Sequence, residues 1–334
     1  MAKLGIEPEK TTNRPNGGRV LKLVLRRVVL GVITLWAVSV LIFAGTQILP
    51  GDLAQAVLQN NATPENVAAI RQELGLDRPA VERYVEWLTH AMQGDFGTSL
   101  VNQREVAGEL APRLYNTLFL AIYAAVIAVP LALTLGVLAA ARQGSLFDHT
   151  ANAVTLLAIS LPEYFLGYLL IKWLALYLGW FPVLANVAPE TGFFGRLYLS
   201  FLPMLSLVLV IIAHMMRMTR ASVLAVMASP YIEMAFLKGL PKWRIVVEHA
   251  LPNALAPIIN VVALNLAYLI VGVVVIEVVF VYPGLGQSMV DAVSKRDVPV
   301  VQACGLIFAA VFITLNMIAD ILALLSNPRL RHPR

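Results

Sequence analysis

The sequence predicts an all-α protein that crosses a membrane six times. Hydrophobic residues make up 59% of the chain and charged residues only 13%, a balance far from that of a soluble domain. Mean hydropathy is +0.75. The apolar residues gather into six segments, each about as long as a helix must be to cross the hydrocarbon core. Lys and Arg concentrate in alternate connections between these segments, as in multi-pass membrane proteins.

The six expected spans lie near residues 28–49, 114–141, 151–178, 199–216, 254–281 and 300–325. The first follows Lys22, Arg26 and Arg27, and its apolar run of about 22 residues is too long for a cleaved signal peptide, so we expect an uncleaved span. With the N-terminus inside, the inner connections hold 16 Lys and Arg and the outer ones hold 8. This asymmetry predicts that both termini are cytoplasmic.

The spans imply a division of the chain into a cytoplasmic N-terminal tail (1–27), a first span with an extracytoplasmic helical segment (28–113), a five-helix transmembrane core (114–326) that contains a cytoplasmic loop (217–252), and a cytoplasmic C-terminal tail (327–334). The segment after the first span carries a net charge of −4 over residues 50–113. Helices are expected from Pro64 and over 80–92. This segment is either an amphipathic lid on the membrane or a docking platform for an extracytoplasmic protein.

Residues 231–252 form a strongly polar insert between two apolar segments. Pro241 is expected to divide it into two short helices lying across the membrane face, the second from Trp243 to Leu251. In the first helix Tyr231, Ala235 and Leu240 are expected on one side. Such a pair can pass a rigid-body push from a soluble partner, or can be an ordinary amphipathic interfacial segment.

Particular motifs carry a resemblance to a known family. Glu233-x-Ala235-x-x-x-Gly239, followed by Ala250-Leu251-Pro252-Asn253, is similar to the EAA loop of ABC-importer membrane subunits. Further motifs appear in the family's order: Leu49-Pro50-Gly51-Asp52, Leu74-Gly75-Leu76-Asp77, Gly94-Asp95-Phe96-Gly97-Thr98-Ser99, Met216-Arg217-Met218-Thr219-Arg220-Ala221, Glu277-x-x-Phe280-x-Tyr282-Pro283-Gly284-Leu285-Gly286, Arg296-Asp297-x-Pro299 and Asn327-Pro328-Arg329. Over nearly its whole length the chain resembles the first, B-type permease of the dipeptide/oligopeptide/nickel transporter family.

The resemblance implies a type I ABC-importer permease fold in a bacterial inner membrane, with no enzymatic activity and no bound cofactor. It implies a second, homologous permease subunit, two ATP-binding subunits that use ATP and Mg, and an extracytoplasmic substrate-binding protein. Contact with the ATPases would fall to the loop residues Glu233, Ala235, Lys238, Gly239, Leu240 and Pro252, with Ala235 packed inside that contact. Where the family often has Arg or Lys, this chain has Phe236 and Leu237, which makes the loop surface more apolar.

Ionisable groups inside spans are costly, so each needs a partner, water or a function. Glu163 follows Pro162 in the third span, at a position where the family more often has a small residue. It can meet a cationic solute in the translocation path, or pair with Lys172 or with a cation of a partner subunit. Glu277, before the turn at Tyr282, is expected to form a gate or a structural anchor. For Asp320 we expect a local pair with Arg329 or a side chain that reaches the interface.

Other functional classes are disfavoured. The sequence holds no basic stretch interleaved with aromatic residues, which is the pattern typical of nucleic-acid binding. His214, His249 and Cys304 lack the spacing of metal ligands, and the sequence holds no zinc-protease motif or nucleophile elbow. It also holds no G-x-x-x-x-G-K-[ST] phosphate loop, so ATP must be hydrolysed by another chain.

Two functions remain for comparison. The first is an importer subunit for peptides, or for nickel chelates, glutathione, opines or sugars. The second is an ion-coupled secondary transporter, which would leave residues 231–252 unexplained.

Overall fold

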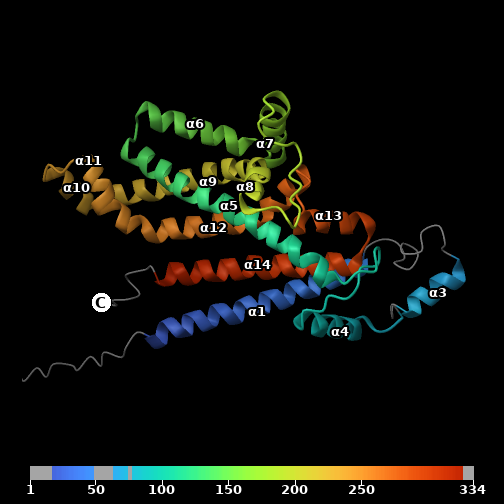
Figure 1. Cartoon of the computed structure of the whole chain (residues 1–334). Coiled ribbons are helices and arrows are strands. Elements are labelled where there is room, and N and C mark those ends of the chain that lie inside the picture. The colour runs from blue at the N-terminus through green and yellow to red at the C-terminus, as the bar shows by residue number, and fades with distance from the viewer. Residues whose placement is uncertain (1–16, 49–62, 74–76, 326–334) are drawn as a thin grey trace, which may run out of the picture.

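A computed structural model of the chain describes residues 17–48, 63–73 and 77–325 (Figure 1). The regular structure in these ranges is helical, apart from an isolated bridge between Thr98 and Glu105. Of the expected N-terminal tail (1–27), residues 1–16 lie outside the described residues and 17–27 belong to α1, and the expected C-terminal tail (327–334) lies outside the described residues. The elements in order are α1 (Gly17–Ile48), α3 (Pro64–Glu73), α4 (Ala80–Met92), α5 (Val106–Ala141), α6 (Leu146–Ser160), α7 (Glu163–Leu170), η2 (Ile171–Tyr177), α8 (Phe193–Leu199), α9 (Phe201–Met227), α10 (Pro230–Leu237), α11 (Lys242–Arg244), η3 (Ile245–Ala250), α12 (Leu251–Val279), α13 (Leu285–Lys295) and α14 (Val298–Leu325).

The predicted spans are confirmed, with one change of shape. Five helices, in α1, α5, α9, α11–α12 and α14, are long and apolar enough to cross a membrane. The third expected span is instead a broken pair, α6 followed by α7 and η2, bent by 102°. The break lies at Leu161 and Pro162, both in extended backbone conformation. A proline disfavours the helical conformation of the residue before it, which explains the position of the break.

Two helix boundaries differ from those expected, and the differences shorten the 217–252 loop. Helix α9 continues past the expected end at residue 216 to Met227. The expected separate helix from Trp243 to Leu251 is wrong, because α11, the π-helical η3 and α12 form one continuous helix from Lys242 to Val279. Hydropathy marks where a helix leaves lipid, and these helices extend beyond that point.

Small side chains allow α5 to pack closely along α9, in the centre of the bundle. Buried alanines at Ala124, Ala128 and Ala132 recur every four residues on α5, and Gly136 continues the row. A Cβ at Gly136 would lie only 2.8 Å from the backbone oxygen of Met216. Without a strong hydrophobic force between helices in lipid, such close backbone approach supplies the packing energy.

The first and last helices pair alongside this core (Figure 1). Arg27 of α1 forms an ion pair with Asp320 of α14 at 2.7 Å, whereas the expected local partner, Arg329, lies outside the described residues. Near the opposite end of the pair, the amide of Gln302 donates to Thr46 at 2.7 Å. Polar contacts therefore fix both ends of an otherwise apolar helix pair.

Helix α4 and the loop after it are joined to the bundle by hydrogen bonds and ring contacts. Tyr84 of α4 shares a hydrogen bond with Ser39 of α1 at 2.8 Å, and its ring lies 5.4 Å from that of Phe43. The following loop is fastened by Asp297, which accepts hydrogen bonds from the Ser99 hydroxyl and from the backbone N–H of Leu100. Helix α4 is confirmed at its expected position. The choice between a lid and a docking platform stays open.

Helix α6 is held to α9 by an ion pair. Arg220 donates from Nε to Asp148 at 2.6 Å and from Nη2 at 2.8 Å, a bidentate contact in which the Asp148 side chain is 4% exposed. The N–H of Gly144 donates to the same carboxylate at 3.0 Å, so the turn before α6 is fixed as well. This buried pair joins the broken span to the core.

We therefore expect Arg220→Met to destabilise the protein by about 3–5 kcal/mol, because it leaves a buried carboxylate unpaired. The measurement is thermal unfolding of the purified protein in detergent. Adding Asp148→Asn should recover most of the loss. The control is Arg244→Met, which breaks an exposed pair with Glu248 and should cost less than about 1 kcal/mol. Equal unfolding temperatures for Arg220→Met and wild type would contradict this role.

Candidate functional site

Helix α10 and the turn after it form a small platform at one end of the bundle (Figure 1). Gly239 follows the helix with φ of +76°, a left-handed conformation that glycine adopts without steric cost. Its N–H donates to the carbonyl of Phe236 at 2.9 Å, and the N–H of Leu240 donates to that of Ala235 at 3.3 Å. These two hydrogen bonds form a Schellman motif, which gives partners to backbone carbonyls that would otherwise have none at the end of the helix.

One face of the platform belongs to the chain's own core. Ile232 and Ala235 pack with Ile245 and Ala250, and Leu240 lies against the same cluster. Tyr231, four residues before Ala235 and on the same side of the helix by spacing, is 47% exposed, whereas Ala235 is 7% exposed and is covered by this chain's own residues. Contact of the loop residues with another subunit stays a prediction.

The other face of the platform is open and unusually apolar. Glu233, Lys238, Gly239 and Pro252 are exposed. Large apolar side chains of the same segment are exposed as well, with exposed fractions of 43–75% at Tyr231, Met234, Phe236, Leu237, Trp243 and Val247. The apolar surface expected from Phe236 and Leu237 is therefore present. Clustered exposure of this kind marks an interaction surface.

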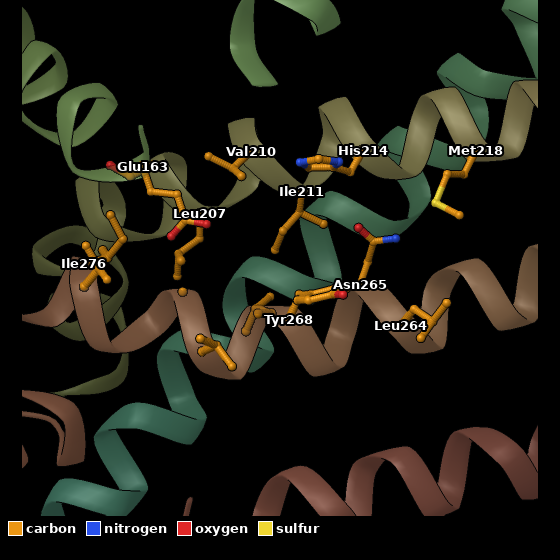
Figure 2. A pocket seen from close by; sticks show the side chains of 15 residues that line it. Glu163, Leu207, Val210, Ile211, His214, Met218, Leu264, Asn265, Tyr268 and Ile276 are labelled. Atoms are coloured by element: carbon orange, nitrogen blue, oxygen red, sulfur yellow. The ribbon is translucent and has the colours of Figure 1, made fainter. Parts of the chain in front are cut away.

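A cavity of about 510 Å³ opens between α7, α9 and α12 (Figure 2). Glu163 enters it from the first turn of α7 rather than from the middle of a long helix, since the span is broken just before it. Its carboxylate lies against Gly272 of α12, where a Cβ would be 3.0 Å from Oε2. The glycine leaves room for the carboxylate.

Sequence reasoning missed the other polar groups of this cavity. His214 on α9 and Asn265 and Tyr268 on α12 also line it. The signal available was spacing, because polar residues three apart in an apolar helix share a face. The relation of α9 to α12 could not be read from the sequence.

Glu277 is completely buried and lies outside that cavity. Its carboxylate accepts from the hydroxyl of Thr117 at 2.6 Å and from the N–H groups of Gly286 at 2.7 Å and Gln287 at 3.1 Å. These amides belong to the start of α13, so the carboxylate joins α5, α12 and α13. A Cβ at Gly284 would fall 2.1 Å from Glu277 Oε1, which leaves glycine as the residue that fits.

Tyr282 belongs to the same turn. It is fully buried, and its hydroxyl donates to the carbonyl of Asn116 at 2.9 Å. The amide of Asn116 donates to the carbonyl of Pro283 at 2.9 Å. The three residues expected in the substrate path or gate therefore separate into two places: Glu163 in the cavity, and Glu277 with Tyr282 in the closed turn.

The described residues hold no group of three His, Cys, Asp or Glu side chains that could bind a metal ion. Cys304 is free and buried.

Comparison with known proteins identifies the family. The family described as "Binding-protein-dependent transport system inner membrane component" matches residues 132–332, and its N-terminal counterpart matches residues 20–121. The chain is 36% identical over 313 residues to the glutathione transport system permease protein GsiC of Escherichia coli strain K12, covering 94% of this chain and all of the relative. The same protein of Salmonella typhi shows the same identity and coverage. The dipeptide transport system permease protein DppB of Escherichia coli strain K12 is 34% identical over 339 residues, covering 94% of this chain and all of DppB.

These matches span nearly the whole chain and agree with the apolar helices of the fold. The resemblance inferred from the motifs is confirmed: this chain belongs to the family of inner membrane permease components of binding-protein-dependent transport systems.

Proposed function

We propose that this chain is one of two permease subunits that together form a translocation path for di- or oligopeptides or related small solutes. A binding protein delivers the solute outside, and two separate ATPase subunits drive its passage with ATP and Mg. Peptides are the proposed class because the relatives are named for dipeptide and glutathione transport. Loop charges favour placing the α10 end and both termini in the cytoplasm.

One observation carries the coupling role: α10 is fixed to the chain's own core on one face and presents apolar side chains on the other. The buried face makes α10 part of the bundle, so a push on its open face moves α9 and the long helix from Lys242. Glu233, Lys238 and Gly239 lie in or beside that open face. Ala235 and Leu240 act from within, by holding the platform in place.

The deciding experiment is reconstitution of the whole importer in lipid vesicles with its partner permease, ATPases and binding protein. Uptake of a labelled dipeptide should require ATP on the side of the membrane where the ATPase subunits are bound. A proton or sodium gradient should not change it. Uptake driven by an ion gradient with the ATPases omitted would instead establish a secondary transporter.

Gly239 offers a sharper test, because a matched glycine exists at the same end of the bundle. Gly239 and Gly144 both have left-handed φ, at +76° and +79°, and a Cβ at either meets nothing within 4 Å in this chain. Asparagine tolerates this conformation best after glycine, so the same substitution strains both sites equally. Gly239→Asn should lower ATP-driven uptake at least about tenfold, through loss of about 1.4 kcal/mol or more of coupling.

Gly144→Asn should leave uptake near the wild-type level. Both variants should reach the membrane in normal amounts, measured by quantitative immunoblotting. Equal uptake by the two variants would remove the special role of the surface at Gly239 and leave only its helix-closing role.

We further propose that Glu277 and Tyr282 act as an anchor for the turn before α13 and do not select solutes. The carboxylate has three hydrogen-bond donors, none from a cavity-lining group. A carboxylate that is fully buried and already accepts three hydrogen bonds from this chain is closed to a solute.

Gly284→Ala should therefore destabilise the protein by about 1–3 kcal/mol, because the added methyl group displaces the Glu277 carboxylate from its donors. Thermal unfolding of the purified importer measures the change. Gly108→Ala is the control, since a Cβ there meets nothing within 4 Å. The anchor role fails if Gly284→Ala unfolds at the same temperature as Gly108→Ala.

A further inference from the structure

The cavity between α7, α9 and α12 contains a carboxylate although its walls are mostly apolar. Most of its lining is aliphatic, contributed by leucine, isoleucine and valine side chains of α9 and α12. Glu163 is the one carboxylate among the described residues that line it, and His214 and Tyr268 are the other titratable groups in the lining. Figure 2 shows the Glu163 side chain directed into the space beside Leu207 and Val210.

Nothing within the described part of the chain compensates this carboxylate. No hydrogen bond or ion pair to Glu163 is found among those residues, in contrast to Glu277 and Asp148, which are saturated with donors. Lys172, nine residues on, is exposed and lies over the ring of Tyr177, 6.0 Å from its centre. An uncompensated carboxylate in a half-buried apolar setting is costly unless a cation or a donor visits it.

The other polar groups of the cavity are complementary to a ligand that donates hydrogen bonds. The amide nitrogen of Asn265 donates to the carbonyl of Val261 at 2.8 Å, which leaves the amide oxygen free to accept. Tyr268 is 71% exposed, and its hydroxyl can accept as well. A primary ammonium has three N–H donors and no acceptor, so it matches the Glu163 carboxylate together with the acceptor oxygens of Asn265 and Tyr268.

The dimensions fit a short peptide. Gly272, which lies against Glu163, and Asn265 are seven residues apart on α12, or about 10 Å along the helix axis. An extended chain covers about 3.5 Å per residue, so two or three residues span this distance. A peptide whose amino end is at Glu163 would reach Asn265 with its second or third residue.

We propose that Glu163 binds the primary ammonium group of the transported solute inside this cavity, so that the permease itself favours solutes with a free amino terminus. The proposal rests on the proposed function and adds a selection step within the membrane. Gly272 is the positioning residue, because it makes room for the carboxylate.

The first test measures the charge selectivity of the cavity without any substrate. Cys304 is the sole cysteine of the chain and is buried, so Cys304→Ala gives a cysteine-free background. Val210→Cys then places one thiol in the lining. In the assembled importer, the ratio of modification rates by cationic aminoethyl and anionic sulfonatoethyl methanethiosulfonate should fall about tenfold when Glu163→Gln is added.

Met218→Cys is the matched control, since it lines the same cavity but is eight residues, about 12 Å, further along α9. The change caused by Glu163→Gln should be clearly smaller there. A ratio at Val210→Cys that Glu163→Gln leaves unaltered overturns the proposal. A ratio that changes in the isolated chain but not in the assembled importer also overturns it, because a cation of a partner subunit then occupies Glu163.

The second test uses two probes, trialanine and N-acetyl-trialanine, on the Val210→Cys importer without its binding protein. Trialanine should slow modification by the neutral methyl reagent at least threefold, the acetylated peptide should not, and Glu163→Gln should abolish the difference. Equal protection by both peptides, or by neither, contradicts the role of Glu163. If ATP-driven uptake persists in that case, only the role of Glu163 fails and the proposed function stands. If the importer shows no ATP-driven uptake, the proposed function itself fails, whatever the labelling result.

Discussion

The constraint on which the rest of this fold depends is that no backbone polar group within the membrane can rely on water. Long helices satisfy the constraint by themselves, so the informative places are those where helices stop. The turn after α12 is one, and there Glu277 accepts the N–H groups of Gly286 and Gln287 that open α13. The break at Pro162 is another, and a cavity lies immediately beside it. At the turn after α12 a carboxylate satisfies the backbone N–H groups, whereas the break at Pro162 faces the cavity.

The same comparison separates two carboxylates that look alike in the sequence. Glu163 and Glu277 both lie in apolar surroundings at the end of a helix. Glu277 meets three donors from two other helices, whereas no donor from the described residues meets Glu163. A carboxylate that serves the fold is saturated by the fold. This contrast, more than the position of either residue, is why we assign Glu277 to architecture and Glu163 to solutes.

Much of the architecture could be predicted from the sequence, because hydropathy alone locates segments that lipid must surround. Helix α10 was also expected, from the polar sequence between two apolar segments and from the motif, while its coupling role stays a proposal. Helix ends were less predictable: Arg217 and Arg220 indicate the edge of the lipid, yet α9 continues to Met227 because helical hydrogen bonding does not end there. Long-range partners were out of reach. Nothing local in the sequence connects Asp320 with Arg27, or Glu277 with Thr117, which is 160 residues earlier.

The uninterrupted helix from Lys242 to Val279 has a further consequence. Its first turns carry Trp243 on the open platform, its middle lines the cavity with Asn265 and Tyr268, and its last turn holds Glu277. The platform, the cavity wall and the anchored turn therefore belong to one continuous piece of backbone, which includes the π-helical η3 and Pro257. A displacement of the platform cannot leave the cavity wall out of account, because both are carried by the same helix.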